Sequence, residues 1–125
     1  MASRIIAPGW WSNLKIFECG HECSPQNPCR FHTKRDRYLL MYITEGTVRI
    51  LKNNQSFELS KGDLFTVMPE ESATAHWNSD VPFEHIWISF SCDICPDFLL
   101  HSVIRRPPVK PIFLTIRDHI ADHSF

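Results

Sequence analysis

The chain has 125 residues, of which 43% are hydrophobic and 12% aromatic, enough for one domain with a substantial core. Its formal net charge of −1 excludes the basic excess that nucleic-acid binding requires, so we expect any DNA contact to come from residues outside this chain. No apolar run approaches the roughly 18 residues of a membrane span, and residues 1–14 lack a signal-peptide pattern, which predicts a cytoplasmic protein without membrane contact.

The early part of the chain carries few regular signals, and its prolines predict an irregular loop from about Ser24 to Lys34. Five cysteines, an odd number, predict reduced thiols rather than a disulfide framework. One alternative is a zinc-stapled module built on Cys19 to His32, where three thiols and two imidazoles, including that of His21, could supply four ligands. The candidate set is Cys19, Cys23, Cys29 and His32. Their spacing matches no standard structural zinc site, so we interpret the thiols as bystanders and predict no metal and no cofactor.

From residue 38 onward the pattern is strongly β. Short apolar or alternating runs are separated by turn residues such as Gly46, Asn53-Asn54 and Gly62-Asp63. The predicted strands span residues 38–44, 47–51, 56–59, 64–68, 73–78 and 84–91. Several short strands at regular spacing predict an antiparallel barrel or sandwich.

The character changes after Cys92. Residues 97–105 predict a short helix, three prolines then interrupt the chain, residues 112–114 predict one more strand, and residues 115–123 predict the start of a second helix. We therefore expect a single domain over residues 1–125, with a barrel in residues 1–92 and a helical tail in residues 97–125. We expect this tail to be truncated.

Three segments together resemble a known family. YLLMYITEGTVRI at 38–50, LSKGDLFTVMP at 59–69 and VPFEHIWISF at 81–90 follow one another as they do in the N-terminal regulatory domain of the AraC family. The resemblance implies a mostly β, cupin-like antiparallel barrel (a double-stranded β-helix, or jelly roll) followed by short helices. It also implies the effector-binding and dimerisation domain of a bacterial transcription regulator. The full-length protein would be a homodimer that contacts DNA through a C-terminal domain absent from this chain.

A stand-alone metal-dependent cupin enzyme or isomerase is the alternative. Enzymatic cupins hold a metal through two histidines and a glutamate in one motif and a histidine in another. In this sequence the motif glutamate falls at Leu39 and the last histidine at Ala73. Neither residue can bind a metal, so we predict that the chain is not an enzyme.

The candidate ligand residues begin with His85 and Trp87, which share one strand face because side chains alternate. Resemblance to AraC-like sugar sensors implies that both positions are pocket residues. An indole face stacks on a sugar ring, and an imidazole hydrogen-bonds a hydroxyl, so we expect a sugar or a related small polar metabolite. The alternative is that Trp87 fills the core and that His85 is a buried histidine with protein partners.

Three further residues are candidates for the same site. The cupin motif count implies that Leu39 points inward, so by alternation Arg37, just before the strand at 38–44, and Met41 should point inward too. Trp77 lies on the strand at 73–78. Arg37 could hold a ligand hydroxyl or carboxylate, or pair with Asp36 or Glu84 at the surface. Met41 could line the pocket or fill the core, and Trp77 could close the pocket or contact a second subunit.

Overall fold

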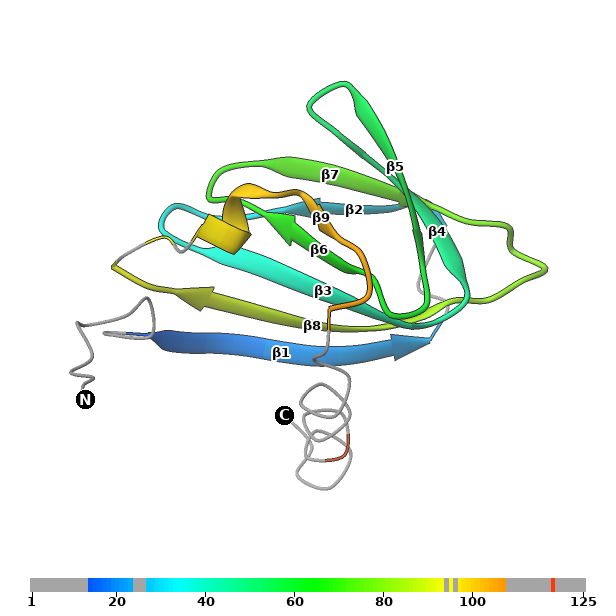
Figure 1. The fold of residues 1–125 in the computed structure, drawn as a ribbon, viewed down its shortest axis with the longest axis horizontal. Coiled ribbons are helices and arrows are strands. Elements are labelled where there is room, and N and C mark those ends of the chain that lie inside the picture. Colours follow the sequence, from blue (N-terminus) through cyan, green and yellow to red (C-terminus); the bar gives the residue numbers. More distant parts are fainter. Residues whose placement is uncertain (1–13, 24–26, 94, 96, 108–117, 119–125) are drawn as a thin grey trace, which may run out of the picture.

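The computed structural model describes residues 14–23, 27–93, 95, 97–107 and 118. These residues contain nine strands and one short 3-10 helix, η1 (Figure 1). The elements are β1 (Lys15–Cys23), β2 (Cys29–His32), β3 (Tyr38–Glu45), β4 (Thr47–Lys52), β5 (Gln55–Ser60), β6 (Leu64–Val67), β7 (Ser72–His76), β8 (Glu84–Ser91), η1 (Asp97–Leu100) and β9 (Val103–Ile104).

The strands form two antiparallel sheets. One sheet has five strands in the order β1-β8-β3-β6-β9, and the other has four in the order β2-β7-β4-β5 (Figure 1). The inner core between them holds these buried side chains: Met41, Ile43, Val48, Ile50, Leu59, Phe65, Val67, Ala73, Ala75 and Phe83. The prediction of a mostly β, antiparallel fold is therefore confirmed, and each of the six predicted strands overlaps an observed strand.

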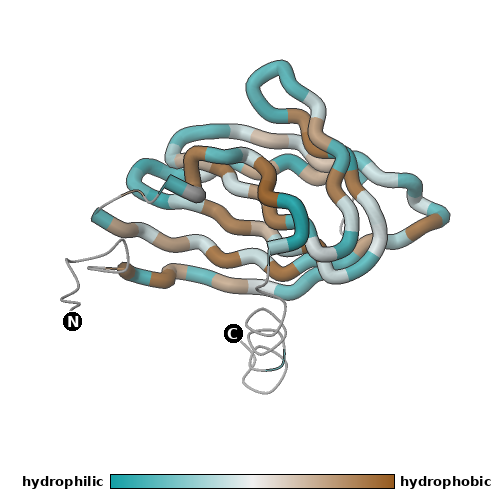
Figure 2. The backbone as a smooth tube through the Cα atoms, in the orientation of Figure 1, coloured by the Kyte–Doolittle hydropathy of each residue, from teal (hydrophilic) through white to brown (hydrophobic). Residues whose placement is uncertain are grey.

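Burial explains why the strands differ in sequence pattern. β4 alternates exposed and buried residues, because only one of its faces meets the core. β3 and β6 are buried on both faces, since a second apolar cluster covers the outer side of their sheet. That outer cluster contains Leu40, Tyr42, Leu64, Ile86, Phe90 and Leu99. Figure 2 shows the resulting contrast between hydrophobic interior strands and the hydrophilic tip of the β4–β5 hairpin.

The predicted helix at 97–105 is wrong. Residues 97–100 form a single 3-10 turn, which places Leu99 in the outer apolar cluster, and residues 103–104 then pair with β6 as β9. The amide of Thr66 also donates to the carbonyl of Ser102 at 2.9 Å. Pairing satisfies backbone groups along the buried edge of β6, and this outweighs local helix propensity.

The loop predicted at 24–34 is wrong in part, because residues 29–32 form β2 and pair with β7. The strand predicted at 112–114 lies outside the described residues, as does the helix predicted at 115–123 apart from Asp118. No helix among the described residues is long and apolar enough to cross a membrane.

Asp63 fixes the chain that leaves β9. Asp63 is only 1% exposed. Its carboxylate accepts hydrogen bonds from the Ser60 amide at 2.9 Å and the Arg106 amide at 3.2 Å. The Arg105 guanidinium adds a charged contact at 2.8 Å. The segment after β9 is therefore held against the predicted turn, in which Gly62 has a φ of 93° that favours glycine.

Candidate ligand pocket

A pocket of about 320 Å³ lies between the two sheets. Residues from β1, β2, β3 and β8 and from the β2–β3 connection contribute to it. They are Glu18, Glu22, Cys29, Phe31, His32, Thr33, Lys34, Arg37, Leu39, Met41, Trp87 and Ser89. Three of the five residues predicted to bind ligand, Arg37, Met41 and Trp87, therefore line one pocket.

Strand pairing arranges the inner face of the five-stranded sheet in rows that run from β1 through β8 to β3. Side chains directly opposite each other in paired strands lie on the same face. The rows are Glu18–Ser89–Leu39, Gly20–Trp87–Met41 and Glu22–His85–Ile43. Polar side chains therefore lie toward β1 and apolar side chains toward β3, so the pocket has one polar and one apolar side.

Gly20 determines where the Trp87 indole lies. A Cβ atom at position 20 would come within 2.6 Å of three atoms of that ring. The missing side chain thus lets the indole lie against the β1 backbone. Glu18 and Glu22 lie on the same strand face, two residues to either side. The sequence therefore places an aromatic ring between two carboxylate-bearing positions.

Lys34 and Arg37 enter the pocket from one turn. The Arg37 amide donates to the Lys34 carbonyl at 3.2 Å, and Asp36 takes a φ of 62°. The Arg37 guanidinium carbon lies 3.9 Å from the centroid of the Phe17 ring, a cation–π contact that orients it. Arg37 forms an ion pair with neither Asp36 nor Glu84 within the described part of the chain.

His85 shares its strand face with Trp87 but is absent from the pocket lining. Its ring stacks on Phe83 with centroids 5.3 Å apart, and the residue is 0% exposed. Neither ring nitrogen has a hydrogen-bond partner among the described residues, and the nearest Glu22 oxygen is 3.9 Å from Nε2, too far for a hydrogen bond. Burial, with help from the charge of His21, lowers the pKa of His85 from 6.5 to about 4. His85 is therefore neutral at pH 7.

We expect the buried His85 to make folding sensitive to mild acid. Its pKa is about 4 in the folded protein and 6.5 in the unfolded chain, so the unfolded chain binds more protons between these values. Stability is full above pH 6.5 and falls by about 3 kcal/mol as the pH drops to the folded pKa. Urea unfolding of wild type and His85→Phe at pH 7.5 and 5.0 measures the difference. A matched His76→Phe change at an exposed position should leave the pH dependence of stability as in wild type. If His85→Phe and His76→Phe had the same pH dependence, His85 would not be the group responsible.

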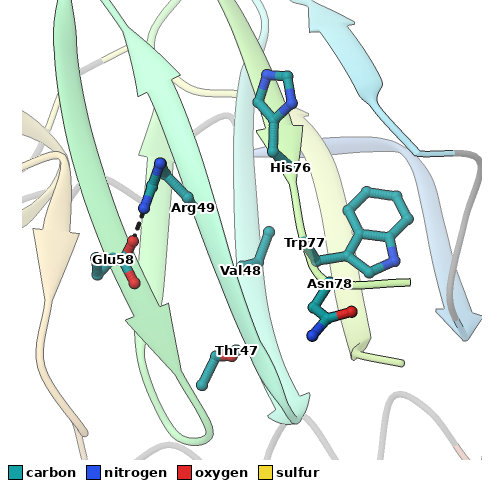
Figure 3. Close-up of a pocket in the computed structure, with 7 residues that line it drawn as sticks. All are labelled: Thr47, Val48, Arg49, Glu58, His76, Trp77 and Asn78. Atoms are coloured by element: carbon teal, nitrogen blue, oxygen red, sulfur yellow. Dashed lines mark hydrogen bonds and ion pairs between the residues drawn. The ribbon is translucent and has the colours of Figure 1, made fainter. Parts of the chain in front are cut away.

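Trp77 lies in a different place from the other predicted residues. It borders a second pocket of about 310 Å³, together with Thr47, Val48, Arg49, Glu58, His76 and Asn78 (Figure 3). Its ring meets Phe83 edge-on, with centroids 4.7 Å apart. The structure therefore does not bring Trp77 to the pocket that contains Trp87.

The cysteine-rich segment forms no metal centre in the described residues, where no three His, Cys, Asp or Glu side chains are grouped to hold an ion. Cys29 lines the pocket, and His32 Nδ1 lies 2.7 Å from the Ser72 hydroxyl. Burial raises the pKa of both the Cys19 and the Cys29 thiol, which disfavours the thiolate that zinc requires. The side chain of Cys23 lies outside the described residues.

The sequence prediction does not include several residues that line or shape the pocket. Glu18, Gly20 and Glu22 alternate along β1, and this polar alternation was the available signal for an inward-facing strand. Lys34 was assigned to an irregular loop, where nothing local shows that the turn at 34–37 faces the barrel.

A two-sheet antiparallel barrel with a partly polar internal pocket defines a cupin-like binding domain. Residues 15–123 match the family model described as the AraC-like ligand binding domain. The chain therefore belongs to this family, whose members are ligand-binding domains and not enzymes.

One curated relative and two solved structures are similar to the chain. Over 74 residues the chain is 32% identical to the Msm operon regulatory protein of Streptococcus mutans, which covers 59% of this chain and 27% of that protein. The chain thus spans about a quarter of the length of this relative. The fold is similar to a cupin protein from Bacteroides fragilis, with a TM-score of 0.53, 17% identity and coverage of 62% and 68% of the two chains. ToxT from Vibrio cholerae gives a TM-score of 0.53 at 8% identity, covering 86% of this chain and 47% of that one.

Proposed function

We propose that the barrel senses a sugar or a related small polar metabolite and that the chain is the effector-binding domain of a bacterial transcription regulator. The observation that supports this most is the Trp87 indole, held against Gly20 and facing a pocket with Glu18 and Glu22 on the same strand. An aromatic face binds the apolar side of a sugar ring, and carboxylates accept hydrogen bonds from its hydroxyls.

His85 has a supporting role in this proposal. Its two unpartnered nitrogens lie one row along the strand from Trp87, and a buried polar group without a partner is costly. A ligand hydroxyl or a bridging water that reached His85 would recover part of that cost. Met41, opposite Trp87 on β3, supplies adaptable apolar contact.

Regulation requires that the effector bind one arrangement of the protein more tightly than another. We propose that the full-length protein is a cytoplasmic homodimer, with this domain contributing to dimerisation and with DNA bound by a separate C-terminal domain. Two helix-turn-helix segments downstream of residue 125 in the gene would agree with this arrangement, and a different downstream domain would contradict it.

We expect a selective rise in the thermal unfolding midpoint when the chain is screened against sugars, glycosides and small organic acids. A ligand at roughly 100 times its dissociation constant adds about 2.7 kcal/mol, which moves a domain of this size by several degrees. Trp87→Ala should abolish the rise. Trp77→Ala is the matched control, because it removes the same side chain from the other pocket and should keep the rise. A rise that survives in Trp87→Ala would place the ligand elsewhere.

A further inference from the structure

Two cationic side chains lie at one rim of the pocket. Lys34 and Arg37 are the first and last residues of one turn, closed by the 3.2 Å hydrogen bond between the Arg37 amide and the Lys34 carbonyl, and both line the pocket. Neither side chain forms an ion pair with a carboxylate in the part of the chain that the structure describes. Two cationic side chains that line one pocket attract an anion that enters it.

The neighbouring groups leave this rim positively charged. Asp36 belongs to the same turn but is exposed and does not line the pocket. His32 already contacts the Ser72 hydroxyl. The Phe17 ring covers one face of the Arg37 guanidinium at 3.9 Å and so orients it, while the in-plane donors suit a carboxylate or phosphate in two-point contact.

The β1 side of the pocket has the opposite character. Glu18 and Glu22 line it, and the Trp87 indole packs on Gly20 between their positions. This wall repels a simple anion but accepts hydrogen bonds from hydroxyls. A ligand that satisfies both walls has a hydroxyl-bearing ring and one acidic substituent.

We propose that the pocket selects an acidic sugar, a carbohydrate ring with one carboxylate or phosphate group that Lys34 and Arg37 bind. This inference rests on the proposed function, because it takes the ligand to be a carbohydrate. The pocket volume of about 320 Å³ is at the small end for ligand sites, which suits a single sugar ring.

Titration calorimetry on the full chain tests the proposal. The probes are glucose and galactose, their uronates, their 6-phosphates and their 2-amino derivatives. We expect a uronate or a 6-phosphate to bind at least about tenfold more tightly than the neutral parent sugar, and to weaken as salt is raised. The uronate and phosphate arms distinguish the two sources of negative charge.

Two variants that each remove one positive charge distinguish a direct contact by Arg37 from a general effect of charge. Arg37→Gln should remove the preference for the acidic sugar, measured as the ratio of the dissociation constants of the neutral parent and the acidic sugar. Arg35→Gln is the matched control, because it removes the same charge from an exposed residue of the same turn that does not line the pocket. It should behave as wild type.

The possible outcomes are distinct. Equal affinity for neutral and acidic sugars, equal effects of Arg37→Gln and Arg35→Gln, or tighter binding of the amino sugars would each overturn the inference and leave the proposed function standing. Binding of none of the sugars would count against both.

Discussion

Glu71→Gln is expected to lower the free energy of unfolding by about 3 kcal/mol, because it leaves the Lys52 ammonium uncompensated in the interior. The Lys52 side chain is 5% exposed, and its Nζ lies 3.0 Å from the Thr66 carbonyl and 3.2 Å from a Glu71 oxygen. Glu71 also accepts hydrogen bonds from the Met68 amide at 2.7 Å and from Asn53 at 2.8 Å. This network ties β4 to the turn before β7.

The cost should be asymmetric between the two partners. Lys52→Met removes the buried charge itself, and Glu71 keeps its two other donors and is 21% exposed, so we expect a loss below about 2 kcal/mol. Urea unfolding of both single variants and the double variant measures the coupling. Glu58→Gln is the control, because it breaks an exposed pair with Arg49 (69% and 61% exposed) and should change stability by less than about 0.5 kcal/mol. Equal losses from Glu71→Gln and Glu58→Gln would refute the argument.

Acid should weaken the same network. Burial raises the pKa of Glu71, but the hydrogen bonds from Asn53 and Met68 and the charge of Lys52 outweigh burial and place the pKa below 4.5. Because the folded pKa is depressed, this contribution is present above pH 4.5 and is lost as the pH falls through the folded value. The loss of stability from protonating Glu71 therefore sets in at a lower pH than the loss from protonating His85, which begins near pH 6.5.

The parts of the fold that sequence predicts are those set by local signals. The hairpins follow turn residues that adopt positive φ, with Gly46 at 81°, Asn53 at 53° and Asn54 at 63°. β1 and β2 lack such signals, because each pairs with a strand far along the chain, as in Cys29↔Ala75. Long-range pairing of this kind is decided by the assembled sheets and not by the segment itself.

The candidate site also contains residues that sequence patterns identified and residues that they could not. Alternation along β3 and β8 grouped Arg37 with Met41 and His85 with Trp87, and the family resemblance indicated that these faces point inward. His85 lies on the same face of β8 as Trp87 and stacks on Phe83, but it is fully buried and does not line the pocket. The carboxylates of Glu18 and Glu22 were not predicted, because their inward direction depends on the pairing of β1 with β8.

Gly20→Ala is expected to weaken effector binding by at least about 30-fold while the protein still folds. The added methyl group would lie 2.6 Å from the Trp87 ring, and the contact is with the far end of a side chain and not with backbone. The indole must therefore swing away from β1, at a folding cost of about 1–3 kcal/mol. Losing an aromatic anchor costs about 2 kcal/mol or more of binding free energy, a drop in affinity of at least about 30-fold.

The measurement pairs calorimetry, using whichever sugar raises the unfolding midpoint, with the NMR shift of the Trp87 indole N–H. We expect weaker binding and a displaced indole signal in Gly20→Ala. Cys19→Ala is the control on the adjacent residue, whose side chain points to the opposite face of β1, and it should change neither. If Gly20→Ala kept wild-type affinity with the indole signal shifted, the ligand would not depend on the orientation of Trp87. Because the three atoms nearest to a methyl group at Gly20 all belong to the Trp87 ring, this variant tests the central contact of the proposed site without removing any group that binds.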